Sequence, residues 1–447
     1  MKRILTIAGS DSGGGAGIQA DVKTITLLGG FATSVLTALT AQNTVEVRAI
    51  HPVPPSFIDE QLNAVLSDIG ADAVKTGMLF DVPAIEIVAD RLRAYGMEKL
   101  VVDPVMVAKA GDLLLLEEAR KTLIDRLIPI AFLVTPNVPE AEILSNRSIE
   151  KEDDVYEAAR VIHALGPNHV LIKGGHLKGP AKDILYDGND FYVYEKNRVS
   201  TPHTHGTGCV YSAAIATHLA RGLDIKKAVT EAKDFIHTAI QAALPLGKGH
   251  GPTNIFARFQ KSQEKYSVIE ALNASLARLQ EVSLGFLVPE VQSNLGYALP
   301  FAETHADVAA FPGRLVRLGE KLVAVSSPRF GASRHIAAII LTAMRRDSAF
   351  RSAMNIRFSE ARIRQCKALG WEVRSFDRAH EPGHIKEQEG GTLEWGTQAV
   401  LSEGPEIPDV IYDRGEIGKE PMIRVLGRSP EEVVKKVIQL AEKHSSY

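Results

Sequence analysis

The chain has 447 residues, of which 45% are hydrophobic and 23% charged, and its net charge is -3. This length exceeds what one hydrophobic core usually holds, so a globular protein with two domains is expected. The small charge excludes an overall attraction to nucleic acid or to an anionic membrane, and two cysteines, Cys209 and Cys366, exclude a disulfide framework and a cysteine-based zinc site.

The first eight residues begin like a signal peptide, but the apolar run breaks into a glycine-rich segment at 9–15 that has no cleavage pattern. We interpret it as a first strand followed by a loop. The longest later apolar stretch, around 336–344, is too short to span a bilayer. These features predict a cytoplasmic protein without a membrane partner.

Short apolar runs alternate with helical patterns through the first 260 residues. Runs that are apolar throughout predict buried, mostly parallel strands in an α/β sheet with helices on both faces. Nearly every run ends in polar or glycine-rich sequence, and ligands of such sheets bind at the carboxyl ends of the strands. The runs are 4–8, 34–40, 73–75, 100–103, 132–135 and 170–173.

A polar segment without apolar periodicity predicts a linker at 261–267, between domains of 1–260 and 268–447. The second part alternates again, which predicts a smaller α/β domain. Its expected helices are 268–279, 333–346, 359–369 and 430–443, and its expected strands are 283–288, others within 308–326, 354–358 and 371–376.

The sharpest local signal is the glycine-rich run 204–209, which leads into a helical pattern. Glycines just before a helix leave backbone N–H groups free beside the positive end of the helix dipole, an arrangement that holds a phosphoryl group. A simple glycine-rich turn is the alternative. Cys209, in the first helical turn, would have its thiolate favoured by the same dipole, unless it is a buried structural cysteine.

The glycine-rich loop 13–17 fits a permissive dinucleotide-binding pattern. The acidic residue expected at the end of the next strand is missing, however, since Gln42 and Asn43 stand there, and no Gly-Lys-Ser/Thr of a P-loop follows. A loop fitted closely over a flat substrate suits these glycines better, with Asp21 and Gln42 supplying donors and acceptors.

Polar residues that follow the strands suggest a Mg²⁺ site. Asp103, Asn137 and Glu140 offer the oxygen ligands that Mg²⁺ prefers, often through water. Asn137 and Glu140 could instead cap the helix after Pro139. Lys173, followed by two glycines, can reach a phosphate.

These motifs together resemble the hydroxymethylpyrimidine/phosphomethylpyrimidine kinase family, which has the ribokinase-like fold. The resemblance covers about residues 1–258, in order, and rests on the segments 8–21, 41–44, 75–78, 103–106, 135–141, 173–176 and 204–209. It implies ATP-dependent phosphorylation of hydroxymethylpyrimidine and then of its phosphate. A pyridoxal kinase is the nearest rival within the fold, because pyridoxal is also a flat hydroxymethylated nitrogen heterocycle.

The resemblance also implies roles for individual residues. Substrate would bind among Gly9, Asp21, Gln42 and Met78. The trio Asp103, Asn137 and Glu140 would organise Mg²⁺ and water, and Lys173 and Thr207 would bind nucleotide phosphates. Residues 206–209 would form the anion hole, with Gly206, Gly208 and Cys209 as its catalytic residues. Cys209 stands where relatives outside this family carry a catalytic aspartate.

A second phosphate-type feature is the run 326–335, which leads into an apolar helix. Ser333 is a credible N-cap, and the helix start would present N–H groups beside Arg329, Arg334 and His335. Arginine suits a diphosphate because its planar guanidinium bonds two oxygens at once. A capped surface helix with solvated arginines is the alternative.

This half resembles the archaeal-type thiamine phosphate synthase domain, on the segments 326–335, 354–358, 391–396 and 408–421. The resemblance implies that Arg314 and His335 are catalytic and that the thiazole nitrogen of a thiazole phosphate displaces pyrophosphate from the pyrimidine diphosphate. Relatives of this domain also serve as thiamine phosphate sensors on DNA-binding proteins. No DNA-reading segment is evident here, which favours an enzyme over a sensor. Its expected partners are small-molecule substrates and no nucleic acid. A homo-oligomeric state is also expected.

Overall fold

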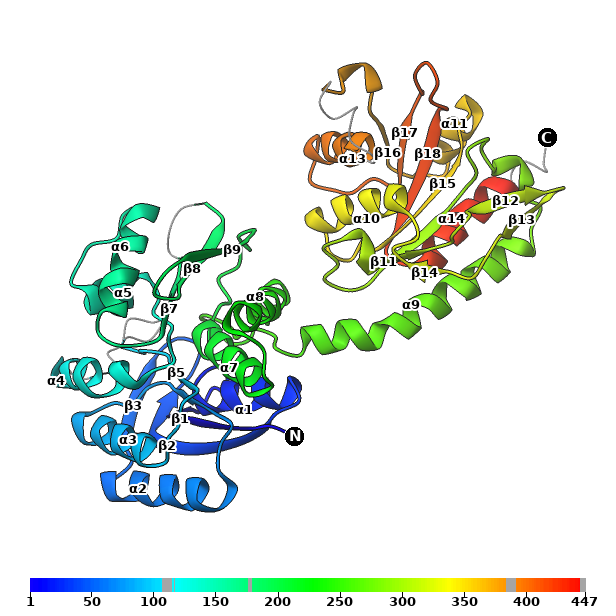
Figure 1. Cartoon of the computed structure of the whole chain (residues 1–447). Coiled ribbons are helices and arrows are strands. Elements are labelled where there is room, and N and C mark those ends of the chain that lie inside the picture. Colours follow the sequence, from blue (N-terminus) through cyan, green and yellow to red (C-terminus); the bar gives the residue numbers. More distant parts are fainter. Residues whose placement is uncertain (107–114, 116, 176–178, 383–390, 443–447) are drawn as a thin grey trace. The chain divides into compact units, whose positions relative to one another are not determined.

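A computed structural model of the chain describes residues 1–106, 115, 117–175, 179–382 and 391–442 (Figure 1). His176, part of one kinase-like motif, lies outside them. The chain divides into two compact units, Met1–Phe259 and Gln260–Tyr447, which are considered separately. No helix among the described residues is both long enough and apolar enough to cross a bilayer.

The first unit is built on a sheet with the strand order β3-β2-β1-β4-β5-β6-β7-β8-β9. Strands β2, β1, β4, β5, β6 and β7 pair in parallel, whereas β3, β8 and β9 join the two edges antiparallel. Each predicted apolar run forms a strand. The strands are β1 (Arg3–Asp11), β2 (Phe31–Gln42), β3 (Val47–Pro52), β4 (Ala73–Thr76), β5 (Leu100–Val102), β6 (Leu133–Val134), β7 (His169–Lys173), β8 (Ala181–Tyr186) and β9 (Phe191–Lys196).

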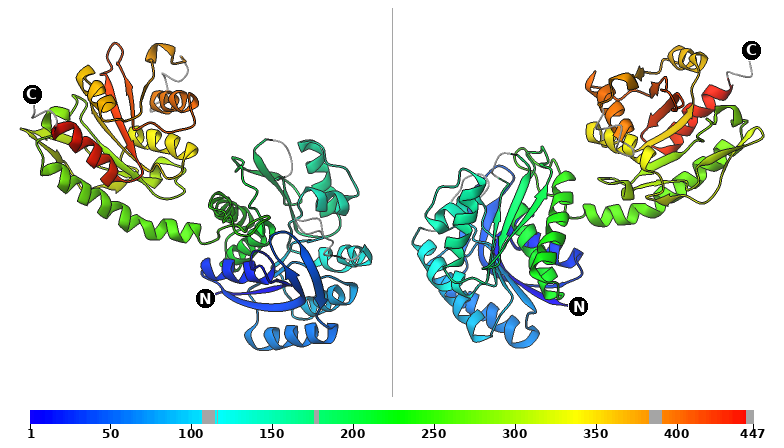
Figure 2. Two further views of the ribbon diagram at one scale, coloured as in Figure 1. Left: turned by 180° about the vertical axis from the view of Figure 1, so that it is seen from behind. Right: turned by 45° about the horizontal axis from the view of Figure 1, so that its top comes forward.

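Helices cover both faces of this sheet (Figure 2). Successive side chains of a strand point to opposite faces, so Leu5 and Ile7 of β1 pack in one core and Ile4 packs in the other. The first core is closed by α2 (Pro55–Ala64), α3 (Val82–Ala94), α4 (Glu117–Thr122), α5 (Val138–Ser145) and α6 (Glu152–His163), and the second by α1 (Gly17–Leu27), α7 (Thr207–Ala220) and α8 (Ile225–Gln241).

The second unit has a smaller sheet of order β14-β11-β10-β15-β18-β17-β16. Its neighbours pair antiparallel except for the parallel pair β16 and β17. Its strands are β10 (Leu295–Ala298), β11 (Val308–Ala310), β14 (Arg329–Phe330), β15 (Ser352–Arg357), β16 (Val373–Ser375), β17 (Val410–Asp413) and β18 (Met422–Gly427), and a separate hairpin joins β12 (Leu315–Leu318) to β13 (Lys321–Ala324).

Both faces of this second sheet are also covered. One core contains side chains of α10 (Arg334–Arg346) and α13 (Gly391–Ser402), and the other those of α9 (Ala257–Gln280), α11 (Glu360–Ala368) and α14 (Pro430–Glu442). Strand β15 serves both cores, since Ala353 packs with α10 and Met354 packs with α11 and α14. The α/β class of both units therefore agrees with the sequence prediction.

Two local predictions were wrong. Helix α9 begins at Ala257, so the segment 261–267, predicted as an irregular linker, is helical. Its Lys, Gln and Glu residues favour a helix even without an apolar stripe. The predicted strand 283–288 contains a 3₁₀ helix, Gly285–Leu287, because Gly285 packs against the backbone of Gly319 and donates its N–H to the carbonyl of Glu320.

Candidate active sites

The kinase-like residues of the first unit meet at the carboxyl ends of the parallel strands. Asp103 follows β5, Lys173 ends β7, and Gly208 lies in the first turn of α7. The Lys173 ammonium donates to Asp103 at 2.9 Å, and a Cβ added to Gly208 would lie 3.4 Å from Lys173 Nζ and 3.5 Å from an Asp103 oxygen. Three segments that are distant in the sequence thus converge on one point.

Asp103 is held by several groups at once. Besides Lys173, the hydroxyls of Thr135 and Ser212 donate to it, and its residue is only 2% exposed. Burial acts to raise the pKa of Asp103, but the ammonium groups of Lys173 and Lys75 outweigh burial and lower this pKa. The carboxylate is therefore ionised at neutral pH and fixes Lys173 beside the start of α7.

A second buried ion pair lies close by. Lys75 and Asp21 are fully buried, 2.8 Å apart, and the Thr6 hydroxyl also donates to Asp21. Burial acts to lower the pKa of Lys75, yet the negative charges of Asp21 and Asp103 raise it. Asp21 has no exposed side-chain surface, and its Oδ2 accepts the Lys75 ammonium.

Asn137 and Glu140 form the helix cap that was the alternative to a metal site. The Asn137 side chain accepts the N–H of Glu140 and the Glu140 carboxylate accepts the N–H of Asn137, a reciprocal capping box at the start of α5. The Glu140 carboxylate nevertheless interacts electrostatically with Lys173 and Asp103 of the site. Burial raises its pKa to about 7, with Lys173 opposing and Asp103 adding to that effect.

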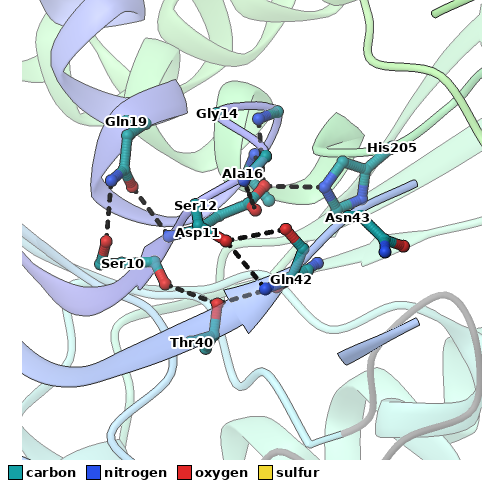
Figure 3. Close-up of polar contacts among 12 residues, drawn as sticks. Ser10, Asp11, Ser12, Gly14, Ala16, Gln19, Thr40, Gln42, Asn43 and His205 are labelled. Carbon is teal, nitrogen blue, oxygen red and sulfur yellow. Dashed lines mark hydrogen bonds and ion pairs between the residues drawn. The ribbon is translucent and has the colours of Figure 1, made fainter. Parts of the chain in front are cut away.

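The glycine-rich loop is organised by Asp11, which the sequence analysis did not single out (Figure 3). Its carboxylate, 3% exposed, accepts backbone N–H groups of Gly13, Gly15 and Ala16 and contacts His205 Nε2 at 2.9 Å. Burial acts to raise the pKa of Asp11, but these hydrogen bonds lower it. An aspartate two residues before a glycine run is the signal that could have identified it.

The predicted substrate residues lie around this loop. Gly9 and Met78 are neighbours, because a Cβ on Gly9 would be 3.1 Å from the Met78 sulfur. Gln42 ends β2, and its backbone N–H and carbonyl are both bonded to the Ser12 hydroxyl (Figure 3). Gln42 therefore borders the loop, and Met78 lies beside Gly9, which precedes it.

Gly206 is the N-cap of α7 and has a left-handed φ of 80°. It packs directly on the glycine-rich loop, since a Cβ there would lie 1.8 Å from the carbonyl oxygen of Gly15. By helix geometry the N–H groups of Gly208 and Cys209 have no acceptor one turn earlier in the helix, whereas that of Thr207 donates to the carbonyl of Thr204 at 3.3 Å. The Cys209 thiol, partly buried, lies beside the backbone N–H of Gly17.

Cys209 is predicted to alkylate slowly at neutral pH. Burial raises the pKa of its thiol from 9.0 to about 11, which overrides the expected help from the helix dipole. Its thiolate is then roughly 100-fold scarcer at pH 8 than that of an ordinary thiol. The rate of iodoacetamide reaction, followed by mass spectrometry of the Cys209 peptide, should keep rising beyond pH 9, while that of glutathione levels off. A plateau at or below pH 8 would contradict this expectation.

The second unit contains a cavity of about 340 Å³. It brings together the predicted catalytic pair, Arg314 and His335, with the helix N-cap Ser333. Arg314 and the preceding Gly313 both have left-handed backbones, with φ values of 68° and 73°. For an arginine this conformation is strained, and such strain gathers at functional sites. The Arg314 guanidinium donates to the carbonyl of Val291, also in the cavity wall.

Arg329 and Arg334, the other two cations predicted in this region, are exposed and are not among the residues that line the cavity. The wall instead includes Arg378 and Arg424, both buried, whose guanidinium groups are paired with Asp413 behind it. Arg424 had not been considered as a site residue, although an arginine within an otherwise apolar strand must find a partner.

Solved structures resemble the first unit. The ADP complex of Bacillus subtilis pyridoxal kinase is 42% identical, with a TM-score of 0.55, and the match covers 58% of this chain and 99% of that one. Staphylococcus aureus pyridoxal kinase with AMP-PCP and pyridoxal is 36% identical, with a TM-score of 0.54 and coverage of 58% and 94%. The first unit is thus a kinase of the ribokinase-like class, with ATP as its co-substrate.

Family models extend this assignment over both units. The model described as phosphomethylpyrimidine kinase matches residues 11–254, and the one described as thiamine-phosphate synthase ThiN matches residues 271–439. The bifunctional thiamine biosynthesis protein ThiDN of Methanocaldococcus jannaschii is 36% identical over 97% of both chains. The chain therefore belongs to the bifunctional thiamine-biosynthesis transferases that combine a hydroxymethylpyrimidine/phosphomethylpyrimidine kinase with a thiamine-phosphate synthase domain.

The bifunctional protein ThiED of Geobacter sulfurreducens is 55% identical over 56% of this chain. The match spans about half of that protein, 51% of its length. Bacillus subtilis hydroxymethylpyrimidine/phosphomethylpyrimidine kinase is 47% identical over 95% of its length. In both comparisons the matched part is as long as the first unit.

Proposed function

We propose that the first unit uses ATP to phosphorylate hydroxymethylpyrimidine and then its phosphate. The second unit joins the resulting diphosphate to hydroxyethylthiazole phosphate, which yields thiamine phosphate and pyrophosphate. We assign the two activities to residues 1–260 and 268–447, with 261–267 between them. The observation that carries this proposal is that Lys173, Asp103 and the start of α7 converge in one unit, while Arg314 and His335 share a cavity in the other.

In the kinase, the transferred phosphoryl group would lie against the N–H groups at the start of α7, formed by residues 206–209. Lys173 and Thr207 would contact nucleotide phosphates, because Lys173 is buried and aligned beside Gly208. This arrangement stabilises charge that accumulates on the phosphoryl oxygens in the transition state. Gly9, Gln42 and Met78 would contact the pyrimidine. Asp21 would act through Lys75, and Cys209 would contact the reacting hydroxyl as a neutral thiol.

The residues fit a Mg²⁺ ion held largely through water. Asp103 and Glu140 are buried carboxylates that both interact with Lys173, and Asn137 is tied to Glu140 by the capping box. Among the described residues no group of three or more His, Cys, Asp or Glu side chains could form a complete metal cage. Mg²⁺ typically uses one or two carboxylates with substrate phosphates, and it would supply neutralisation of the nucleotide charge.

In the synthase, Arg314 and His335 would stabilise the departing pyrophosphate while the thiazole nitrogen attacks the pyrimidine methylene. The start of α10 adds its N–H groups and its positive dipole end to the same wall of the cavity. Arg329 and Arg334 are exposed beside this helix start and would contribute only to attraction of the anionic substrate.

A product assay tests both activities on the full chain. Wild type should convert hydroxymethylpyrimidine phosphate, ATP, Mg²⁺ and thiazole phosphate into thiamine phosphate. An Arg314→Ala/His335→Ala variant should stall at the pyrimidine diphosphate, with its synthase rate lowered by roughly 100-fold or more. Arg317→Ala is the matched control, because Arg317 lies in the neighbouring hairpin, is exposed, and does not line the cavity.

Each alternative gives a different result in this assay. Wild type that also stalls at the diphosphate would leave the kinase in place and make the second unit a thiamine phosphate sensor. The solved pyridoxal kinases, at 42% and 36% identity, favour pyridoxal as a second candidate substrate. Phosphorylation of pyridoxal without formation of pyrimidine diphosphate would replace the first proposal with that one.

The predicted cytoplasmic location and homo-oligomeric state stay predictions. Size-exclusion chromatography with light scattering measures the second, and a monomer at micromolar concentration would contradict it.

A further inference from the structure

The cavity of the second unit has cationic groups in two different halves of its sheet. Arg314 lies in the segment that leads into β12, and Ser333 and His335 follow β14, at one edge of the strand order. Arg424 belongs to β18, and Arg378 follows β16, at the other edge. The cavity is therefore lined by cationic groups from both parts of the strand order.

Two asparagines occupy the wall between these halves. Asn355 of β15 accepts the N–H of Asn294 at 2.7 Å and donates to the carbonyl of Gln292 at 3.0 Å. Asn294 in turn exchanges two hydrogen bonds with the backbone of Phe311. Because these amides are occupied in tying strands together, this part of the wall supplies shape, and the charge is supplied at the two ends.

The second cationic end is pre-organised by one carboxylate. Asp413 is fully buried and accepts Arg378 Nε at 2.7 Å, Arg378 Nη2 at 3.3 Å and Arg424 Nη2 at 2.7 Å. Arg378 is 8% and Arg424 2% exposed. Two guanidinium groups thus share a single carboxylate, which leaves an excess positive charge in a buried place.

A buried excess charge is costly unless an opposite charge meets it. Each guanidinium has five N–H donors, and Asp413 occupies only some of them. The remaining donors belong to residues that line the cavity. Among the residues that the structure describes, the wall holds the cations Arg314, Arg378, Lys419 and Arg424 but only one carboxylate, Glu420, whose oxygens accept the N–H groups of Glu290 and Val291. The chemistry complementary to this end is a phosphate.

We propose that Arg378 and Arg424, held in place by Asp413, form the subsite for the phosphate monoester of the thiazole substrate. This inference rests on the proposed synthase function. The reaction brings together two phosphorylated molecules, and the end with Arg314 and His335 is assigned to the diphosphate. The Arg378–Arg424 end then binds the phosphate of the thiazole substrate. The thiazole ring would lie between this phosphate and the pyrimidine diphosphate, against Asn294 and Asn355.

Calorimetric titration of the full chain measures this subsite without any turnover. Wild type should bind hydroxyethylthiazole phosphate more tightly than hydroxyethylthiazole, and inorganic phosphate should compete with the phosphate ester. In Arg378→Gln and Arg424→Gln the affinity for the ester should fall roughly 10- to 100-fold, with the affinity for the pyrimidine diphosphate unchanged. Arg345→Gln is the matched control, because Arg345 is exposed, paired with Glu394, and absent from the cavity wall.

Three results would overturn the inference. Wild type could bind the ester no more tightly than the alcohol, or not bind the ester at all. The arginine variants could lose affinity only for the pyrimidine diphosphate, or they could keep the wild-type affinity for the ester. The wild-type comparison needs no variant, so equal binding of ester and alcohol overturns the inference even if a substituted chain fails to fold. Failure of the synthase proposal is read separately, as the absence of thiamine phosphate in the product assay. A chain that binds the ester through these arginines yet forms no product would retain the subsite and lose the catalytic assignment.

Discussion

Replacing Gly206 with alanine should reduce the kinase rate by roughly 100-fold or more, the loss expected when a phosphoryl-binding hole is disrupted. The new Cβ would lie 1.8 Å from the Gly15 carbonyl oxygen, so either the glycine-rich loop or the start of α7 must move. Both segments belong to the proposed site. The rate of diphosphate formation from hydroxymethylpyrimidine phosphate and ATP measures the effect, and the synthase rate with supplied diphosphate should be unchanged.

Gly222→Ala is the matched control for this change. Gly222 follows α7 and has a similar left-handed φ of 92°, but nothing lies within 4 Å of its added Cβ. Both variants therefore share a backbone strain of about 1–2 kcal/mol, and only Gly206→Ala adds the collision. Equal kinase rates in the two variants would show that the contact between loop and helix does not matter for catalysis.

The sequence allowed the first unit to be predicted well, because buried parallel strands are apolar throughout and end in recognisable polar motifs. The six predicted strands form, and the convergence of Lys173 with Asp103 follows from their shared sheet edge. Strands β3, β8 and β9 escaped prediction. Strands β3 and β9 are the two edge strands and have no buried residue, and β8, next to β9, contains Lys182 and Asp183, so none of the three gives a continuous apolar run of the kind found in the parallel strands.

The contacts that each site residue makes were harder to predict than its place at the sheet edge. The contact of Asp21 with substrate stays a prediction, but its pairing with Lys75, 54 residues away in the chain, could not be read from a local motif. The same holds for Asp11 and His205, which are 194 residues apart. Cys209 illustrates competing effects, because the sequence reveals the helix start but not the burial that raises the pKa of its thiol.

In the second unit the cavity wall comes from loops and strand ends spread over more than 130 residues, which no local motif announces. Arg314 and His335 were identified through family resemblance, and the structure places both in the wall. Arg329 and Arg334 fitted the same helix-start argument, yet neither of them lines the cavity. A pattern of cations before a helix indicates that some of them face an anion, but the direction of each side chain is decided by packing.

Asp413→Asn should produce the largest loss of stability in the second unit. Asp413 is paired with two buried guanidinium groups, and removal of one partner of a buried ion pair typically costs about 3–5 kcal/mol. Burial acts to raise the pKa of Asp413, but Arg424 and Arg378 lower it below its ordinary value of 3.8. Its stabilising contribution is thus complete above that ordinary pKa and is lost as the pH falls through the lower folded-state pKa.

Urea unfolding followed by tryptophan fluorescence measures this loss in the second unit alone, because the two tryptophans of the chain, Trp371 and Trp395, both belong to that unit. At pH 7 the midpoint for Asp413→Asn should fall well below that of wild type. Glu394→Gln makes the same carboxylate-to-amide change in the exposed pair with Arg345 and should cost less than about 1 kcal/mol. Below about pH 4 the wild type should lose the stability that ionised Asp413 contributes, whereas Asp413→Asn lacks this contribution at every pH. The unfolding midpoints of the two chains should therefore approach each other as the pH falls. Equal midpoints at pH 7 would mean that the arginines are stabilised without Asp413, and the pre-organised phosphate subsite would lose its physical basis.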